Sequence, residues 1–101
     1  MPDFATAREI RKFDKKLSRE ELARALRFNI AAEYEAVQIY EQIVEAIDDE
    51  YMKAVIRDII NEEKLHAAQF WELLVNVDPE EAKAHKQGIE ENKKHKQTLG
   101  K

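Results

Sequence analysis

The chain has 101 residues and a formal net charge of -4, and 38% of its residues are charged. Only two glycines and two prolines interrupt a sequence rich in alanine, glutamate and lysine, which is typical of helices rather than of sheets joined by tight turns. The absence of cysteine excludes disulfides, thiolate metal sites and cysteine nucleophiles, and no apolar run approaches the roughly 20 residues that cross a membrane.

Two long helices are predicted between residues 18 and 77. Ser18-Arg19-Glu20-Glu21 matches a capping box, in which the serine hydroxyl and the last glutamate each bind a backbone N–H of the first turn. The first helix should begin there and run to about Ile47. Asp48-Asp49-Glu50 supplies a new N-cap and negative charge for a second helix, which should continue to about Val75.

Residues 78–101 are predicted to form a short third helix and a basic tail. Asp78-Pro79 places a capping side chain before a proline at the first helical position, which predicts a helix over about residues 79–96. Residues 1–17 carry no such signal, and we interpret them as a flexible lead-in.

Apolar side chains recur in a 4-3 pattern along both long helices, as they do where neighbouring helices pack along a seam. The pattern comprises Leu26, Ile30, Val37, Val44 and Ile47, and then Met52, Ile56, Ile59, Phe70, Leu73 and Val77. Flanking apolar residues make each face wider than one pair of helices can bury. We therefore predict an all-α fold, an antiparallel two-helix hairpin with a short C-terminal helix, whose remaining apolar surface is covered by further helices.

Three polar side chains, Glu33, Glu63 and His66, interrupt these apolar seams. If the chain folds back at about residue 48, Glu33 lies 15 residues before the turn and Glu63 lies 15 residues after it, so the two carboxylates are level. His66 follows one turn further along the same face. A buried carboxylate is costly without a partner, and carboxylates combined with imidazole suit iron, manganese or zinc. The sequence therefore predicts a metal site between the two helices.

These side chains are half of the ligand set of a helical di-metal site, which takes a Glu from each of two helices and Glu-x-x-His from each of two others. A symmetric dimer would complete the set in a four-helix bundle and would also cover the surplus apolar surface. The net charge is −8 over residues 18–78 and +2 over residues 1–17 and 79–101 alike, so the middle of the chain should attract cations. No basic cluster indicates a nucleic-acid partner.

Two stretches, AAEYEAVQIYEQ over residues 31–42 and INEEKLHAAQFWELL over residues 60–74, resemble the encapsulated ferritin family of the ferritin-like group. The first keeps the spacing between Glu33 and Tyr40, and the second keeps Glu-Glu-Lys-x-His-Ala-Ala. The resemblance implies a ferritin-like bundle made by two chains, an annular decamer of five such dimers, and a ferroxidase that oxidises Fe(II) with O2 at an inter-subunit di-iron centre. It also implies an encapsulin shell protein as partner, and we expect the chain to be cytoplasmic, inside an encapsulin nanocompartment.

The resemblance further implies roles for individual residues. The ligands of two iron ions per dimer would be Glu33, Glu63 and His66, with Glu63 bridging the ions. Manganese, zinc or calcium could replace iron. Tyr40 would lie beside the site of the partner chain, and Glu35 matches a position that guides iron toward the site.

Two other functions fit the same residues. One is a di-metal peroxidase of the rubrerythrin or manganese-catalase type, which the lack of a cysteine-bound rubredoxin centre disfavours. The other is a metal-free helical oligomerisation module, in which Glu63 and His66 form a buried pair that fixes helix register, and Tyr40 is an ordinary core aromatic. Under all three functions we expect Glu62, His85 and His95 to lie on the solvated surface. Glu35 is expected there too unless it guides iron.

Overall fold

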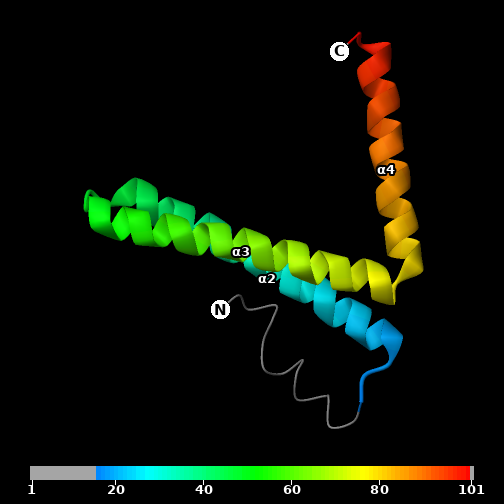
Figure 1. Cartoon of the computed structure of the whole chain (residues 1–101), viewed down its shortest axis with the longest axis horizontal. Helices are drawn as coiled ribbons and strands as arrows, with labels where there is room; N and C mark the ends of the chain where they lie inside the picture. Colours follow the sequence, from blue (N-terminus) through cyan, green and yellow to red (C-terminus); the bar gives the residue numbers. More distant parts are fainter. Residues whose placement is uncertain (1–15, 101) are drawn as a thin grey trace.

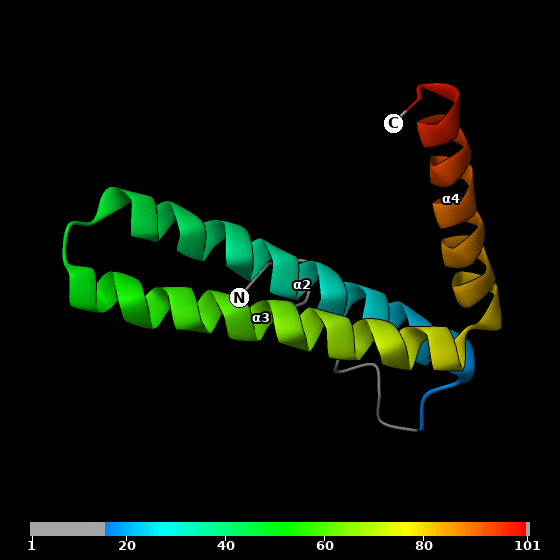
Figure 2. The same cartoon turned by 45° about the horizontal axis from the view of Figure 1, so that its top comes forward.

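The computed structural model describes residues 16–100, which form three α-helices and no strand. Helix α2 spans Arg19–Ala46, α3 spans Glu50–Val77 and α4 spans Pro79–Thr98. Helices α2 and α3 lie antiparallel and side by side, and α4 leaves the end of α3 at a steep angle (Figures 1 and 2). The predicted all-α hairpin with a C-terminal helix is therefore confirmed, whereas most of the predicted lead-in, residues 1–17, lies outside the described residues.

Each helix begins at the cap that the sequence predicts. The Ser18 hydroxyl accepts a hydrogen bond from the Glu21 backbone N–H at 3.1 Å, and Glu21 Oε1 accepts one from the Ser18 N–H at 2.8 Å, which completes the capping box. Asp49 accepts a hydrogen bond of 3.0 Å from the first turn of α3, and Asp78 accepts one of 3.1 Å from the first turn of α4. Pro79 occupies the first position of α4, where its missing N–H costs nothing.

The core of the hairpin is small, because two helices alone can bury few side chains. The buried apolar residues are Ala23, Leu26 and Val37 on α2 and Ile60, Ala67 and Leu74 on α3. The residues that pack against the part of this core nearest α4 are Ile30, Phe70, Trp71 and Val77. Helix α4 has no buried residue.

The predicted seam of α3 is rotated relative to the one observed. The 4-3 pattern places Met52, Ile59 and Leu73 against α2, but these side chains are 54%, 39% and 48% exposed. Ile56, Phe70 and Val77 of the predicted row are half-buried, but the fully buried positions are Ile60 and Leu74, which directly follow Ile59 and Leu73. Apolar residues flank both rows, so the pattern alone does not decide which row faces α2, since one residue turns a helix by about 100°.

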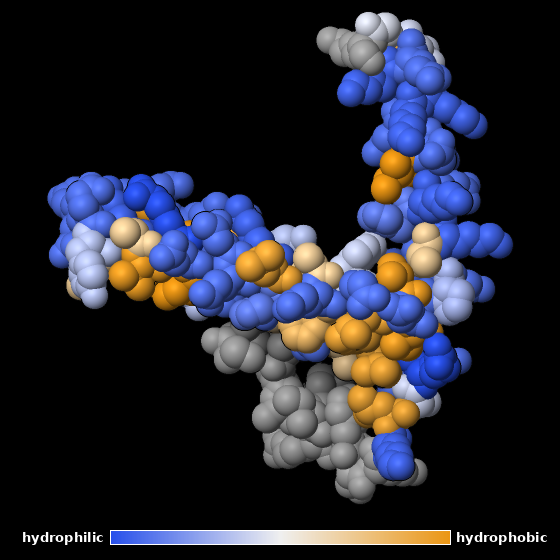
Figure 3. Space-filling model, viewed as in Figure 1, coloured by the Kyte–Doolittle hydropathy of each residue, from blue (hydrophilic) through white to orange (hydrophobic). Residues whose placement is uncertain are grey.

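Large apolar side chains remain exposed along the hairpin, and Figure 3 shows them as patches that continue to the corner with α4. They include Phe28, Ile39 and Ile43 on α2 and Met52, Val55, Ile59, Leu65 and Leu73 on α3. The radius of gyration is 17.6 Å, against about 12–13 Å for a compact domain of this length. A single chain thus leaves uncovered much of the apolar surface that further helices are predicted to cover. Within residues 16–100, no helix is both long enough and apolar enough to cross a membrane.

Candidate metal centre

Glu33, Glu63 and His66 meet between the two helices of the hairpin. Glu33 belongs to α2, whereas Glu63 and His66 belong to α3, where their spacing of three residues places them on the same side. One carboxylate oxygen of each glutamate and one ring nitrogen of the histidine all lie within 4.8 Å of one another. The structure therefore brings together the three side chains that interrupt the apolar seams, while their role as metal ligands stays a prediction.

The register of the hairpin explains this meeting. Helix α2 ends at Ala46 and α3 begins at Glu50, so the fold-back is centred on residue 48 as predicted. Glu33 and Glu63 are equally far from that turn in sequence, and both helices rise by about 1.5 Å per residue. The two carboxylates are therefore level across the pair of antiparallel helices.

The Glu33 carboxylate is poorly satisfied within one chain. Its side chain is 19% exposed, and its Oε2 atom is buried with no hydrogen-bond partner among the described residues. His66 Nδ1 lies 3.5 Å from this oxygen, within ion-pair distance but beyond the length of a well-formed hydrogen bond. An oxygen in this position, next to a second carboxylate and an imidazole, fits the donor set of a divalent transition-metal ion.

The surroundings of Glu33 also shift its pKa. Burial raises the pKa of this carboxyl because it penalises the charged form, and this is the largest effect. The neighbouring Glu63 raises the pKa further, by a hydrogen bond to the protonated form and by repulsion of the charged form, whereas His66 lowers it. The carboxyl therefore retains a proton to higher pH than usual when no cation is present.

His66 is more exposed than the predicted seam implies. Its side chain is 48% exposed, because the buried row of α3 passes through Ile60 and Ala67 and leaves His66 at the edge of the contact with α2. A shallow groove opens there, and Glu33 and His66 are among its lining residues. His66 and part of Glu33 thus face the groove, whereas the Glu33 Oε2 atom is buried and Glu63 does not line the groove.

Both polar and apolar side chains line the groove beside the cluster. Gln69 and Glu72 line it together with the apolar Phe70 and Leu73. No motif or spacing marks Gln69 or Glu72 in the sequence, because their position depends on the rotation of α3 about its own axis.

Tyr40 and Glu35 do not belong to the cluster formed within one chain. Tyr40 is half-buried on α2, about 10 Å beyond Glu33 along the helix axis. Glu35 is also half-buried, two positions from Glu33 and therefore turned by about 160° around the helix. The predicted roles of Tyr40 beside a partner's site and of Glu35 in guiding iron both stay predictions.

The other two histidines are exposed, as predicted. His85 also contacts Trp71. The His85 ring lies edge-on to the indole ring, with the centroids 5.0 Å apart and an interplanar angle of 61°. Within residues 16–100, no second group of three metal-binding side chains comes together.

Comparisons with known proteins agree with this architecture. Residues 24–100 match the family described as Rubrerythrin. The chain is 42% identical over 76 residues to the encapsulin nanocompartment cargo protein EncC of Myxococcus xanthus, a match that covers 75% of this chain and 58% of that protein. It is 41% identical over 80 residues to a ferritin-like-encapsulin shell fusion protein of Pyrococcus furiosus, a match that covers 79% of this chain and 23% of that protein.

A solved structure shows the same fold. The crystal structure of the encapsulated ferritin domain from Pyrococcus furiosus matches with a TM-score of 0.76 and 41% identity, over 80% of this chain and 83% of that one. The predicted resemblance is thereby confirmed. The chain spans only 58% and 23% of the two curated relatives, so it corresponds to part of each.

Proposed function

We propose that this chain, which belongs to the rubrerythrin family of ferritin-like proteins, is a ferroxidase. Two copies would form a four-helix bundle that oxidises Fe(II) to Fe(III) with O2 and so serves iron storage or detoxification. The observation that carries this proposal is the cluster of Glu33, Glu63 and His66, whose ligand atoms lie within 4.8 Å of one another.

A second copy is required because the cluster of one chain is half of a di-iron ligand set. A twofold axis beside the cluster would supply the missing Glu and Glu-x-x-His from the partner. His66 lies at the edge of the hairpin, and the exposed Ile59 and Leu73 flank it on the same helix, so a contact through this face would bury all three. The resemblance to encapsulated ferritins extends the proposal to a ring of five such dimers.

Within the dimer, Glu33, Glu63 and His66 of each copy would hold the iron substrate, with Glu63 shared between the ions. When bound, two neighbouring Fe(II) ions supply two electrons to one O2 molecule and become Fe(III). Glu33 must release the proton that burial and Glu63 favour, so Fe(II) binding displaces that proton. His66 must present an unprotonated ring nitrogen. Hard carboxylate oxygens then favour the oxidised ion.

We further propose that the chain works inside an encapsulin shell and in the cytoplasm. The Myxococcus relative is named as an encapsulin cargo protein and the Pyrococcus relative as a fusion with a shell protein. An open assembly of small helical subunits encloses no space for a mineral, so a shell would supply the compartment. Tyr40 would lie beside the partner's site, and Glu35 would guide iron toward it.

Anaerobic Fe(II) titration followed by addition of O2 tests the proposed activity. The chain is expected to bind about one iron per subunit and then to consume O2. Glu63→Gln and His66→Ala each remove two ligands from every dimer, and each should lower iron affinity and O2 consumption by at least about 100-fold, more than the loss of a supporting residue causes.

The chain offers a matched control for each of these variants. Glu62→Gln changes the neighbouring exposed carboxylate and His95→Ala changes an exposed imidazole, and both should oxidise iron like the parent chain. Unchanged O2 consumption in Glu63→Gln and His66→Ala would overturn the proposal. Turnover of peroxide without O2 consumption would assign the site to the peroxidase class instead.

A further inference from the structure

Helix α4 has no apolar anchor that holds its direction. It leaves α3 through one extended residue, Asp78, and Pro79 at its first position prevents the two helices from continuing as one. None of its side chains is buried, and only Glu81 and Ala82 are half-buried. The proline forces a bend at this corner, but a bend alone does not decide where α4 points.

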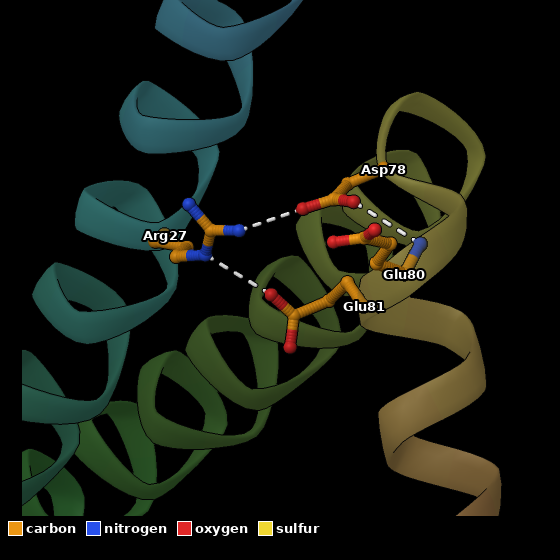
Figure 4. A network of polar contacts seen from close by, with 4 residues as sticks. All are labelled: Arg27, Asp78, Glu80 and Glu81. Atoms are coloured by element: carbon orange, nitrogen blue, oxygen red, sulfur yellow. Dashed lines mark hydrogen bonds and ion pairs between the residues drawn. The ribbon is translucent and has the colours of Figure 1, made fainter.

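Arg27 of α2 binds this corner with two sides of its guanidinium group. Its Nη2 atom donates to Asp78 Oδ2 at 2.8 Å and its Nε atom donates to Glu81 Oε1 at 3.0 Å (Figure 4). The other Asp78 oxygen accepts from the Glu80 backbone N–H at 3.1 Å, so one carboxylate both caps α4 and ties it to α2. A planar guanidinium held at two points fixes orientation more firmly than a single ion pair does.

The fork formed by Arg27, Asp78 and Glu81 connects α4 to α2. Two further contacts near this corner connect α4 to α3. The edge-on contact of His85 with Trp71 comes from α3, and so does the 2.8 Å hydrogen bond from the Asp78 N–H to the Leu74 carbonyl. These contacts lie on the helix from which α4 pivots. The fork adds a second point of attachment, on α2, which restricts rotation of α4 about its junction with α3.

We propose that the Arg27 fork sets the direction of α4 relative to the hairpin, and that ionic strength controls how tightly that direction is held. The side chain of Arg27 is 46% exposed, and those of Asp78 and Glu81 are 26% and 24% exposed, so dissolved ions reach both pairs and screen them. Beyond the fork, residues 82–98 contain five lysines and two glutamates. The fork therefore decides where a basic segment stands relative to the acidic hairpin.

The distance between one spin label on each side of the corner tests this inference without reference to the metal centre. Because the chain has no cysteine, Ala54→Cys on α3 and Asn92→Cys on α4 provide two exposed labelling sites. Dilution with unlabelled chain removes distances between copies. The parent chain should give one narrow distance distribution at low salt, and Arg27→Gln and Asp78→Asn should both widen it and shift its mean. Asparagine keeps the N-cap of α4, so Asp78→Asn removes the ion pair without removing the cap.

Salt and a matched control separate the fork from general effects on stability. In about 1 M salt, where the screening length falls to about 3 Å, the parent distribution should widen toward that of Arg27→Gln, whose own distribution should not change. Arg24→Gln removes the same charge from an exposed position one turn earlier and should leave the parent distribution intact. The inference is overturned if Arg27→Gln and Asp78→Asn both retain the parent distribution, which would show that the proline bend alone directs α4.

Discussion

Glu33 is the residue whose polar group is least satisfied within a single chain. Its Oε2 atom is buried without a hydrogen-bond partner among residues 16–100, and both burial and the nearby Glu63 raise the pKa of this carboxyl. Ionisation of this carboxyl therefore opposes folding when no cation is present. A metal ion held by Glu33, Glu63 and His66 would offset that cost, which ties the stability of the fold to the proposed function.

Removal of this ionisable group should change how stability depends on pH. In the presence of a chelator, the free energy of unfolding of the parent chain is expected to fall as pH rises from 4.5, the usual pKa of a glutamate, through the raised pKa of Glu33. The sign follows because the unfolded chain gives up this proton at a lower pH than the folded chain does. Glu33→Gln should remove this fall while keeping the size of the side chain.

Urea unfolding at a series of pH values measures this effect as the difference between variants. Because His66 and Glu63 lie beside Glu33, the slopes of the parent and the variant must be compared in the same buffers. Glu62→Gln is the matched control and should keep the parent slope, because Glu62 is exposed. An identical slope in the parent and in Glu33→Gln would show that ionisation of Glu33 does not oppose folding.

At the scale of the helices, the sequence predicts where each element begins but not how each is rotated. Ser18, Asp49 and Asp78 bind backbone N–H groups within three residues of themselves, so local spacing is enough to locate the helix starts. The rotation of α3 depends on which apolar side chains α2 covers. In the predicted row, Ile56, Phe70 and Val77 are half-buried, whereas Met52, Ile59 and Leu73 are exposed. The fork likewise escapes prediction, because Arg27 and Asp78 are 51 residues apart.

The cluster could be predicted from sequence because it depends only on how far along their helices Glu33 and Glu63 lie from the turn. Glu33 and Glu63 are equidistant from the turn, and a small rotation of either helix keeps them level. The exposure of His66 could not be predicted, because it depends on that same rotation. Sequence spacing therefore locates residues along helices better than around them.

The corrected rotation of α3 is testable with two adjacent leucines. Leu74 is 1% exposed in the core, and Leu74→Ala should lower the free energy of unfolding by about 2–5 kcal/mol. Leu73 is 48% exposed within one chain, and Leu73→Ala should cost far less in a chelated, dilute sample. Chemical denaturation of both variants decides the matter, and equal losses would contradict the observed burial.

At the scale of the whole molecule, the described chain has an open shape and an exposed apolar face, as the proposed two-chain bundle requires. The described chain measures 53 × 45 × 18 Å, and only six apolar residues are buried, whereas long apolar side chains line its surface. Contiguous apolar surface on a soluble protein often marks a contact with another chain. Because the cluster lies beside this face, the proposed function would couple metal binding to the association of two copies.

Metal should therefore change the size of the assembly. Anaerobic Fe(II) is expected to shift the parent chain to a dimer or a larger species in sedimentation velocity and to raise its melting temperature, because only the folded, associated form binds the ions. A chelator should reverse both changes. His66→Ala should show neither change, while His95→Ala should behave like the parent. Identical sedimentation and melting with and without iron would favour a metal-free oligomerisation module.

We propose that Glu33, Glu63 and His66 bind metal jointly with their copies across a twofold axis. Anomalous scattering at the iron edge, from crystals grown with Fe(II), would locate the metal relative to these side chains. We predict two iron peaks for each pair of chains, close to the twofold axis and within bonding distance of these three side chains. Crystals in which the three side chains face solvent, with no iron peak between the subunits, would contradict the account.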